Sequence, residues 1–217
     1  MFIFLKCWFI DVIMPLCRRC EIMYDKQEVC CFIGHRRVGE KETLKLRIYS
    51  VTEKLINSGM RVFLFGDHSE FNDMCYEAVT ELKSFYPQIV RVLYRKDYPK
   101  ADVYTLQFYL DEFDDCICPD GVGYAGVAAY VERNRAMIAQ SSVCVFYYDT
   151  DYRAISRRYV KNRIITRETK SGTKLAYDFA VSQNLKIINL FENDIKEQSV
   201  FLSSAAHGVT KKLLKKS

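Results

Sequence analysis

A glycine and three side chains that can donate hydrogen bonds follow an apolar run near the start of the chain. Residues 29–33 read VCCFI, and Gly34, His35, Arg36 and Arg37 come next. An apolar run without alternation is typical of a strand buried on both faces of a parallel sheet, and ligands bind outside the carboxyl ends of such strands. Gly34 permits close approach of the backbone to a ligand, and the following side chains supply donors. The motif predicts one wall of a phosphate or sugar site; a tight turn with solvated arginines would account for it as well.

A second group of donors stands before a predicted helix. Ser171, Gly172, Thr173 and Lys174 follow a basic stretch and begin an apolar periodic segment. The free amides and the positive dipole end of a helix N-terminus bind anions, so this position favours phosphate. The alternative is that Ser171 or Thr173 only caps the helix, which is worth about 1 kcal/mol.

A charged segment on a predicted helix is the third candidate. Glu132, Arg133 and Asn134 precede the apolar strand 143–149, and Arg133 shares a helix face with Met137. On an apolar helix the arginine reaches a ligand or forms a surface ion pair, and surface pairs are the commoner case.

Other chemistries have weaker support. Cys17 and Cys20 could be combined with Cys116 and Cys118 as zinc ligands, but no histidine has ligand spacing. No serine or cysteine stands in a pattern that indicates a nucleophile. We therefore predict no metal site and no bound cofactor.

Composition indicates a globular domain of ordinary size. The chain has 217 residues, a formal net charge of +5 and nine cysteines, several in apolar runs, which is typical of reduced thiols in a cytoplasmic protein. Residues 1–22 are apolar but interrupted by Lys6 and Asp11, too broken to span a bilayer. We expect an N-terminal extension from a misplaced start over 1–22, or an interfacial helix there, then one domain over 23–195 and a basic tail over 196–217.

Positive charge is concentrated in two places. Residues 152–170 hold seven Arg or Lys against Glu168 alone, and residues 211–217 hold four Lys. Because like charges repel, we expect 152–170 to be a mobile loop that covers the phosphate end of a pocket and becomes ordered on a polyanion. A solvated loop and a nucleic-acid contact are the alternatives, with Tyr152 and Tyr159 as the aromatic residues present.

Strands and helices alternate along the chain. Apolar runs predict strands, and apolar residues three and four apart predict amphipathic helices between them. Short connections and right-handed crossovers then give a Rossmann-like, doubly wound α/β fold, with a mostly parallel sheet of about five to seven strands and helices on both faces. The strands are expected at 29–33, 60–65, 89–94, 143–149 and 185–191, and the main helices at 40–58, 69–82, 128–139 and 171–180. Residues 97–126 are expected to be a loop-rich excursion around a short helical segment at about 104–113.

Five segments in order carry a resemblance to a known group. They read FIGHRR, FLFGDHSEFNDMCYEAV, YVERNRAMI, FYYD and SGTKLAYDFAV. The set resembles the SLOG superfamily, the Rossmann-like group that joins the DNA-processing protein A fold to the Lonely Guy proteins, and within it is most similar to the YpsA-like branch. The likeness covers roughly residues 27 to 191.

The resemblance implies one activity and also departs from it. Lonely Guy enzymes are phosphoribohydrolases that use an Arg-Lys pair on a helix and a glycine-rich turn followed by an acidic pair. Arg133 matches the arginine, but Asn134 replaces the lysine, and Lys174 begins the segment where the acidic pair should follow. Breaking a glycosidic bond requires a placed carboxylate, a role that Glu132 or Asp149 could take.

We therefore expect one pocket at the carboxyl ends of the strands. The leading hypothesis is a sensor or regulatory module for a nucleotide or nucleotide-derived sugar phosphate; the alternatives are a nucleoside monophosphate N-glycosidase and a single-stranded nucleic-acid binding protein. A homo-oligomer is left open and no membrane partner is expected. Gly34, His35 and Arg36 would form one wall, Gly66 and Phe71 a second, and the phosphate end would hold Arg133, Asn134, Asp149, Ser171, Gly172, Thr173 and Lys174.

Overall fold

The computed structural model describes residues 24–96, 103–122, 125, 128–160 and 163–191. The expected extension over 1–22 and the tail over 196–217 lie outside the described residues, as do Cys17 and Cys20. In the part of the chain that is described, no helix combines the length and apolar character needed to cross a membrane.

Six parallel strands form one open sheet, which confirms the predicted fold class. Their order across the sheet is β4-β3-β2-β1-β5-β8, and every neighbouring pair is parallel. The strands are β1 (Val29–Gly34), β2 (Val62–Phe65), β3 (Val90–Tyr94), β4 (Asp115–Ile117), β5 (Val143–Tyr147) and β8 (Lys186–Asn189).

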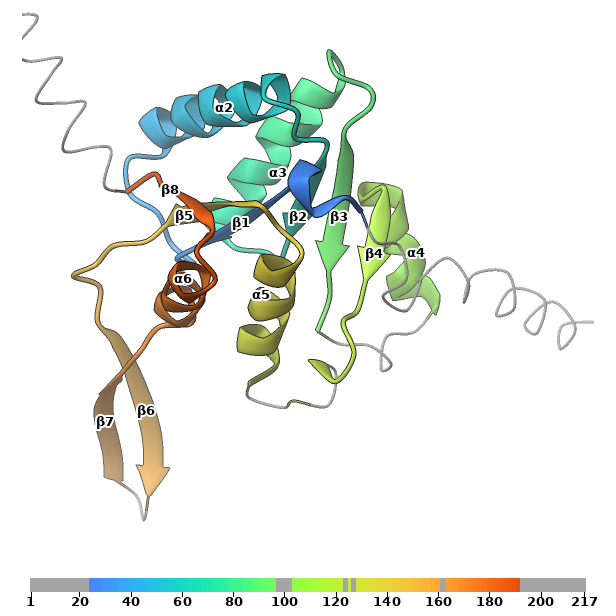
Figure 1. The fold of residues 1–217 in the computed structure, drawn as a ribbon. Helices are drawn as coiled ribbons and strands as arrows, with labels where there is room; N and C mark the ends of the chain where they lie inside the picture. The colour runs from blue at the N-terminus through green and yellow to red at the C-terminus, as the bar shows by residue number, and fades with distance from the viewer. Residues whose placement is uncertain (1–23, 97–102, 123–124, 126–127, 161–162, 192–217) are drawn as a thin grey trace, which may run out of the picture.

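Helices cover both faces of this sheet (Figure 1). A short 3-10 turn, η1 (Lys26–Glu28), leads into β1. One apolar cluster lies between the sheet and α2, α3 and α4, and a second lies between the sheet and α5 and α6. The helices are α2 (Lys41–Asn57), α3 (Glu70–Lys83), α4 (Val103–Glu112), α5 (Ala129–Ala139) and α6 (Gly172–Ser182).

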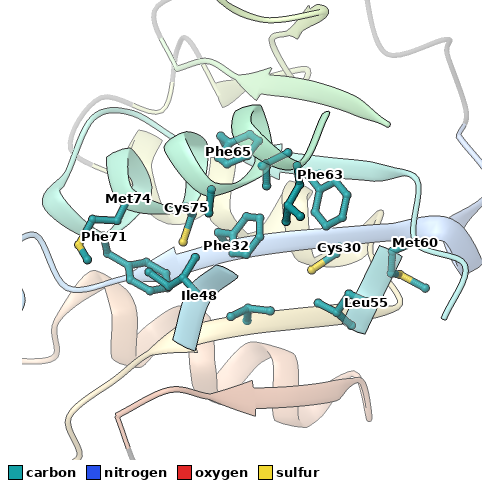
Figure 2. Packing of buried hydrophobic residues seen from close by; sticks show 14 of the residues in the cluster. Cys30, Phe32, Ile48, Leu55, Met60, Phe63, Phe65, Phe71, Met74 and Cys75 are labelled. Atoms are coloured by element: carbon teal, nitrogen blue, oxygen red, sulfur yellow. The ribbon is translucent and has the colours of Figure 1, made fainter. Parts of the chain in front are cut away.

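Alternate residues of β1 enter the two clusters. Cys30 and Phe32 face the cluster under α2 and α3, whereas Val29, Cys31 and Ile33 belong to the cluster under α5 and α6. This explains the unbroken apolar run, because a strand covered on both faces has no solvent side. In Figure 2 the side chains of α2, α3 and the central strands meet around Phe32, whose ring stacks on two neighbouring phenylalanines, Phe63 at 5.9 Å and Phe65 at 5.4 Å.

The chain changes its direction of growth at β1. Strands β2, β3 and β4 are added outward on one side of β1, and β5 and β8 are then added on the other side. The connections that follow β1 and β5 therefore leave the same edge toward opposite faces. In open α/β sheets this switch point is where a crevice opens for a ligand.

Two elements differ from the sequence-based expectations. Within 97–126 the short helix expected around 104–113 is present as α4, whereas the strand β4 was not expected, because its three residues are too few for a periodic signal. The prediction of a mobile loop over 152–170 is wrong, because this segment contains an antiparallel hairpin of β6 (Ala154–Val160) and β7 (Arg163–Thr169). β-branched and aromatic residues such as Ile155, Tyr159 and Ile164 favour strand, and this preference outweighs the repulsion between the cations.

Gly34 offers a test of how tightly β1 is enclosed. A Cβ added at Gly34 would lie 2.4 Å from the ring of Phe71, whereas one added at Gly172 would meet no atom within 4 Å. We expect Gly34→Ala to lower the free energy of unfolding by about 2 kcal/mol, since the buried ring cannot move without opening the core. Gly172→Ala should leave it unchanged or raise it slightly. Urea unfolding of both variants measures the difference; equal stabilities would contradict the packing described.

Candidate functional site

The loop after β1 is held in place by hydrogen bonds from two elements, β5 and α3. The amide of His35 donates to the carbonyl of Tyr147 at 3.1 Å, and the amide of Gly39 donates to the Tyr147 hydroxyl at 3.2 Å. From α3, the amide of Glu70 donates to the Arg36 carbonyl at 3.1 Å, and the Glu70 carboxylate accepts from the amide of Val38 at 3.0 Å. The loop that carries the first motif is therefore positioned before any ligand arrives.

Hydrogen bonding sets the tautomer of His35. Its Nε2 accepts from the amide of Asp149 at 3.1 Å, so the neutral ring carries its proton on Nδ1. The ring is buried and lies beside two tyrosines, with centroids 4.4 Å from Tyr152 and 5.8 Å from Tyr148. Burial lowers the pKa of His35 below its usual value and outweighs the opposing influence of Asp149. The neutral imidazole therefore presents one donor at a fixed place.

Two cavities open at the carboxyl ends of the strands, one of about 450 Å³ and one of about 630 Å³. The larger of the two lies at the switch point. This 630 Å³ space between the ends of β1 and β5 is here called the switch-point cavity. Its volume falls within the range of small-molecule sites. It is lined by His35, Arg36, Arg37, Gly39, Tyr147, Asp149, Tyr152 and Phe191.

Two exposed cations border the switch-point cavity. Within the described part of the chain, neither Arg36 nor Arg37 forms an ion pair with a carboxylate. The helix α2 begins four residues after Arg37, and the side chain of its N-cap residue, Glu40, does not cap it. Uncapped amides at a helix N-terminus and nearby guanidinium groups both favour an anion.

The N-terminus of α6 lies at the same edge of the sheet. Ser171 accepts from the Lys174 amide at 3.0 Å and is thus the predicted cap, and Thr173 is buried behind it. The Lys174 ammonium is 3.4 Å from the Tyr148 hydroxyl and 3.4 Å from the Asp178 carboxylate. The ring of Tyr148 also packs against His35, which lines the switch-point cavity. Tyr148 therefore lies between Lys174 and that cavity.

Arg133 is enclosed beneath the end of β2. It is 5% exposed, its Nη1 lies 3.1 Å from the Asp67 carboxylate, and the amide oxygen of Asn134 accepts from Nη2 at 2.9 Å. Burial lowers the pKa of this guanidinium, and Asp67 opposes that shift. A Cβ added at Gly66 would lie 2.7 Å from the same guanidinium, so the glycine provides the space it occupies.

A second cavity, of about 450 Å³, lies over the ends of β2 and β3. Gly66, Asp67, Arg95 and Lys96 are among the residues that line it. Asp67 is shared by two cations, since the Lys96 ammonium lies 3.6 Å from its Oδ2 and the Arg133 guanidinium lies 3.1 Å from its Oδ1.

The residues expected to form one pocket are thus distributed over neighbouring places on one edge. His35, Arg36 and Asp149 line the switch-point cavity, whereas Gly66 lines the second cavity and Arg133 lies beneath it. Phe71 is fully buried and its ring stacks on Tyr147, so it supports the first motif from within the core.

Glu132 and Asn134 act within their own helix. Glu132 pairs with Arg135 at 2.9 Å on the exposed side of α5, and Asn134 holds the guanidinium of Arg133. Among the described residues, no three metal-binding side chains gather at one point.

Several lining residues were not placed in the expected pocket. Arg37 was counted among the donors of the first motif but not among the pocket residues. Asp67 directly follows Gly66, so its position after a strand was the available signal. Tyr147 and Phe191 gave none, because an aromatic residue at the end of a buried strand is indistinguishable by type from one in the core. Asn189 also went unrecognised; its side chain joins the ends of β5 and β8 through hydrogen bonds of 3.0 Å and 2.9 Å to the Tyr148 backbone.

Comparison with known proteins gives a partial likeness among solved structures. No family model matches the chain, and no curated protein matches it. Among solved structures, DNA processing protein A from Helicobacter pylori, described for its single-stranded DNA binding mode, aligns with a TM-score of 0.45 and 15% sequence identity. The alignment covers 83% of this chain and 77% of that chain.

The protonation of His35 gives a pH-dependent stability. Because burial holds its pKa below the unfolded value of about 6.5, the neutral form stabilises the fold above that pH, and this contribution is lost as the pH falls below it. We expect the free energy of unfolding to fall by at most about 1.4 kcal/mol per pH unit from this group. Urea unfolding from pH 7.5 to 5 should show that the free energy of unfolding declines less steeply in His35→Gln than in the unaltered protein. Identical pH profiles for the two proteins would contradict the lowered pKa of His35.

The enclosed arginine can be tested through its counter-ion. Asp67→Asn leaves the Arg133 guanidinium buried without a charge partner, and we expect a loss of about 2 kcal/mol, below the value for a fully buried pair because Asp67 is partly exposed. Asp73→Asn removes a carboxylate from an exposed pair with His68 and should cost less than about 1 kcal/mol. Equal losses in urea unfolding would show that the enclosure of Arg133 has no energetic consequence.

Proposed function

We propose that this protein binds a nucleotide or a nucleotide-derived sugar phosphate in the switch-point cavity. The observation that supports this most strongly is the pair Arg36 and Arg37 beside the uncapped N-terminus of α2, at the mouth of a cavity of suitable volume. Cations and helix amides together select a phosphate, and the loop that bears them is already fixed by hydrogen bonds.

The rest of the cavity suits a sugar and a base. The Asp149 carboxylate, which receives the amide of Asp151 at 2.8 Å on one oxygen, is an acceptor of the kind that binds ribose hydroxyl groups. Tyr152 is half exposed and offers a ring face on which a base can stack. In this proposal the phosphate lies at Arg36 and Arg37, and the nucleoside extends toward Asp149 and Tyr152.

The cavity favours a binding module over a hydrolase. Of its lining residues, Asp149 is the one carboxylate, whereas glycosidic hydrolysis uses a pair of carboxyl groups in most known enzymes. We therefore propose a sensor or regulatory role. A nucleoside monophosphate N-glycosidase is the second candidate, supported by the placement of the Asp149 carboxylate in the same cavity as the arginines.

Ligand binding should be visible as added stability. With AMP or ADP-ribose present at 100 times its dissociation constant, we expect the free energy of unfolding to rise by about 2.7 kcal/mol. Replacing both Arg36 and Arg37 with alanine should remove this gain. The matched control replaces Lys26 and Lys54 with alanine, which removes the same charge from exposed positions at the opposite edge of the sheet, and should retain it. A gain that persists without the two arginines, or no gain with either compound, would contradict the proposal.

The second candidate has its own readout. Incubation of the protein with adenosine or inosine monophosphate followed by chromatography would detect a released base. Under the binding proposal no base accumulates above a heat-inactivated control. Release that disappears in Asp149→Asn while AMP still stabilises this variant would replace the sensor role with the hydrolase.

A further inference from the structure

The hairpin of β6 and β7 projects from the body of the molecule and carries the densest positive charge in the described chain (Figure 1). It leaves the sheet after β5 and returns at the N-terminus of α6. Seven residues of each strand are paired without interruption, from Ala154 opposite Thr169 to Val160 opposite Arg163. A two-stranded ribbon of this length extends about 20 Å.

The register of the hairpin separates its charges between two faces. Successive positions on a strand alternate between faces, and directly paired positions share one. Ser156 pairs with Arg167, Arg158 with Ile165, and Val160 with Arg163. One face therefore contains positions 158, 163 and 167, all arginine, and it contains no acidic position.

The opposite face is mixed. It contains Arg157, Tyr159 and Glu168, and Glu168 is the one acidic residue between 152 and 170. The separation of this carboxylate from the three arginines is not visible in the composition of the segment. It follows only from the register, which gives the ribbon one face whose charged positions are all arginine, here called the arginine face.

We infer that the arginine face binds the phosphate backbone of double-stranded DNA, independently of base sequence. The major groove of B-form DNA admits a two-stranded β-ribbon, and an ordered ribbon that projects from its domain has the shape for this groove. Positions 163 and 167 are about 13 Å apart along β7, and position 158 on β6 lies between them. Over that length a duplex carries several phosphates on each strand, so three arginines can be neutralised together.

The composition of the face argues against a single strand as the partner. Proteins that bind single strands stack bases on aromatic rings along a basic groove. The one aromatic position of the paired strands, Tyr159, lies on the face opposite the three arginines. A-form RNA is disfavoured as well, because its major groove is deep and narrow.

Salt dependence measures this interaction directly. Fluorescence anisotropy with a 20-bp DNA duplex of arbitrary sequence should give an affinity that falls about 40-fold between 50 and 200 mM salt from these three contacts. Replacing Arg158, Arg163 and Arg167 together with glutamine should remove that part of the salt dependence. Replacing all three with lysine should preserve most of it, because the charges remain.

Two controls distinguish the arginine face from net charge. Replacing Lys26, Lys54 and Lys186 with glutamine removes three charges from exposed positions at the other edge of the sheet, and the salt dependence should be retained. Arg157→Gln, on the opposite face of the hairpin, should change it by less than one third of the effect of the triple variant. A loss of the same size in the lysine-to-glutamine control would overturn the inference, as would equal binding to a single strand of the same length or binding to anionic vesicles in place of the duplex.

Proteolysis tests the same contact without any substitution. Trypsin cleaves after arginine, so at 50 mM salt the duplex should slow cleavage after Arg158, Arg163 and Arg167 in the unaltered protein. Protection confined to sites outside the hairpin would contradict the inference even if a variant fails to fold. Because neither assay contains a free nucleotide such as AMP, failure here leaves the switch-point proposal standing, and failure of AMP binding leaves this one standing.

Discussion

The parallel pairing of β1 with β5 is the interaction on which the rest of this structure depends. Five consecutive positions are paired, from Cys30 opposite Val143 to Gly34 opposite Tyr147, and the ladder continues when the His35 amide donates to Tyr147. Because β2, β3 and β4 all extend from the other side of β1, this pairing joins the two halves of the sheet. It also fixes the place where the loops after β1 and β5 separate and leave a cavity.

This constraint explains why the sequence predicted the fold better than the site. Runs such as VCCFI and VCVFYY have one physical explanation, burial between two layers of helices, and the sheet contains the predicted strands at those places. The burial of both faces of β1 can be inferred from its own unbroken apolar run, without knowledge of contacts that are distant in the sequence. The motif after β1 was identified for the same reason, since it directly follows an unmistakable strand.

The arrangement within the site could not be obtained that way. Whether Arg133 contacts a ligand depends on the space beside Gly66 and on Asp67, and both become visible only when the ends of β2 and α5 are brought together. The basic hairpin shows the converse case. Its charge suggested a mobile loop, yet its β-branched and aromatic residues pair in a regular ladder, and the ladder determines which arginines share a face. In this segment the preference of individual residues for strand predicts the observed hairpin, whereas the net charge led to the wrong prediction of a mobile loop.

The two proposals place an anion site at the carboxyl edge of the sheet and a separate DNA contact on the hairpin of β6 and β7. The central claim concerns the first of these, and a crystal structure with AMP tests it most directly. The account predicts the phosphate within hydrogen-bond distance of Arg36 or Arg37 at the N-terminus of α2, with the ribose near Asp149. A phosphate bound instead in the cavity beside Asp67 and Arg95, with the switch-point cavity empty, would contradict it.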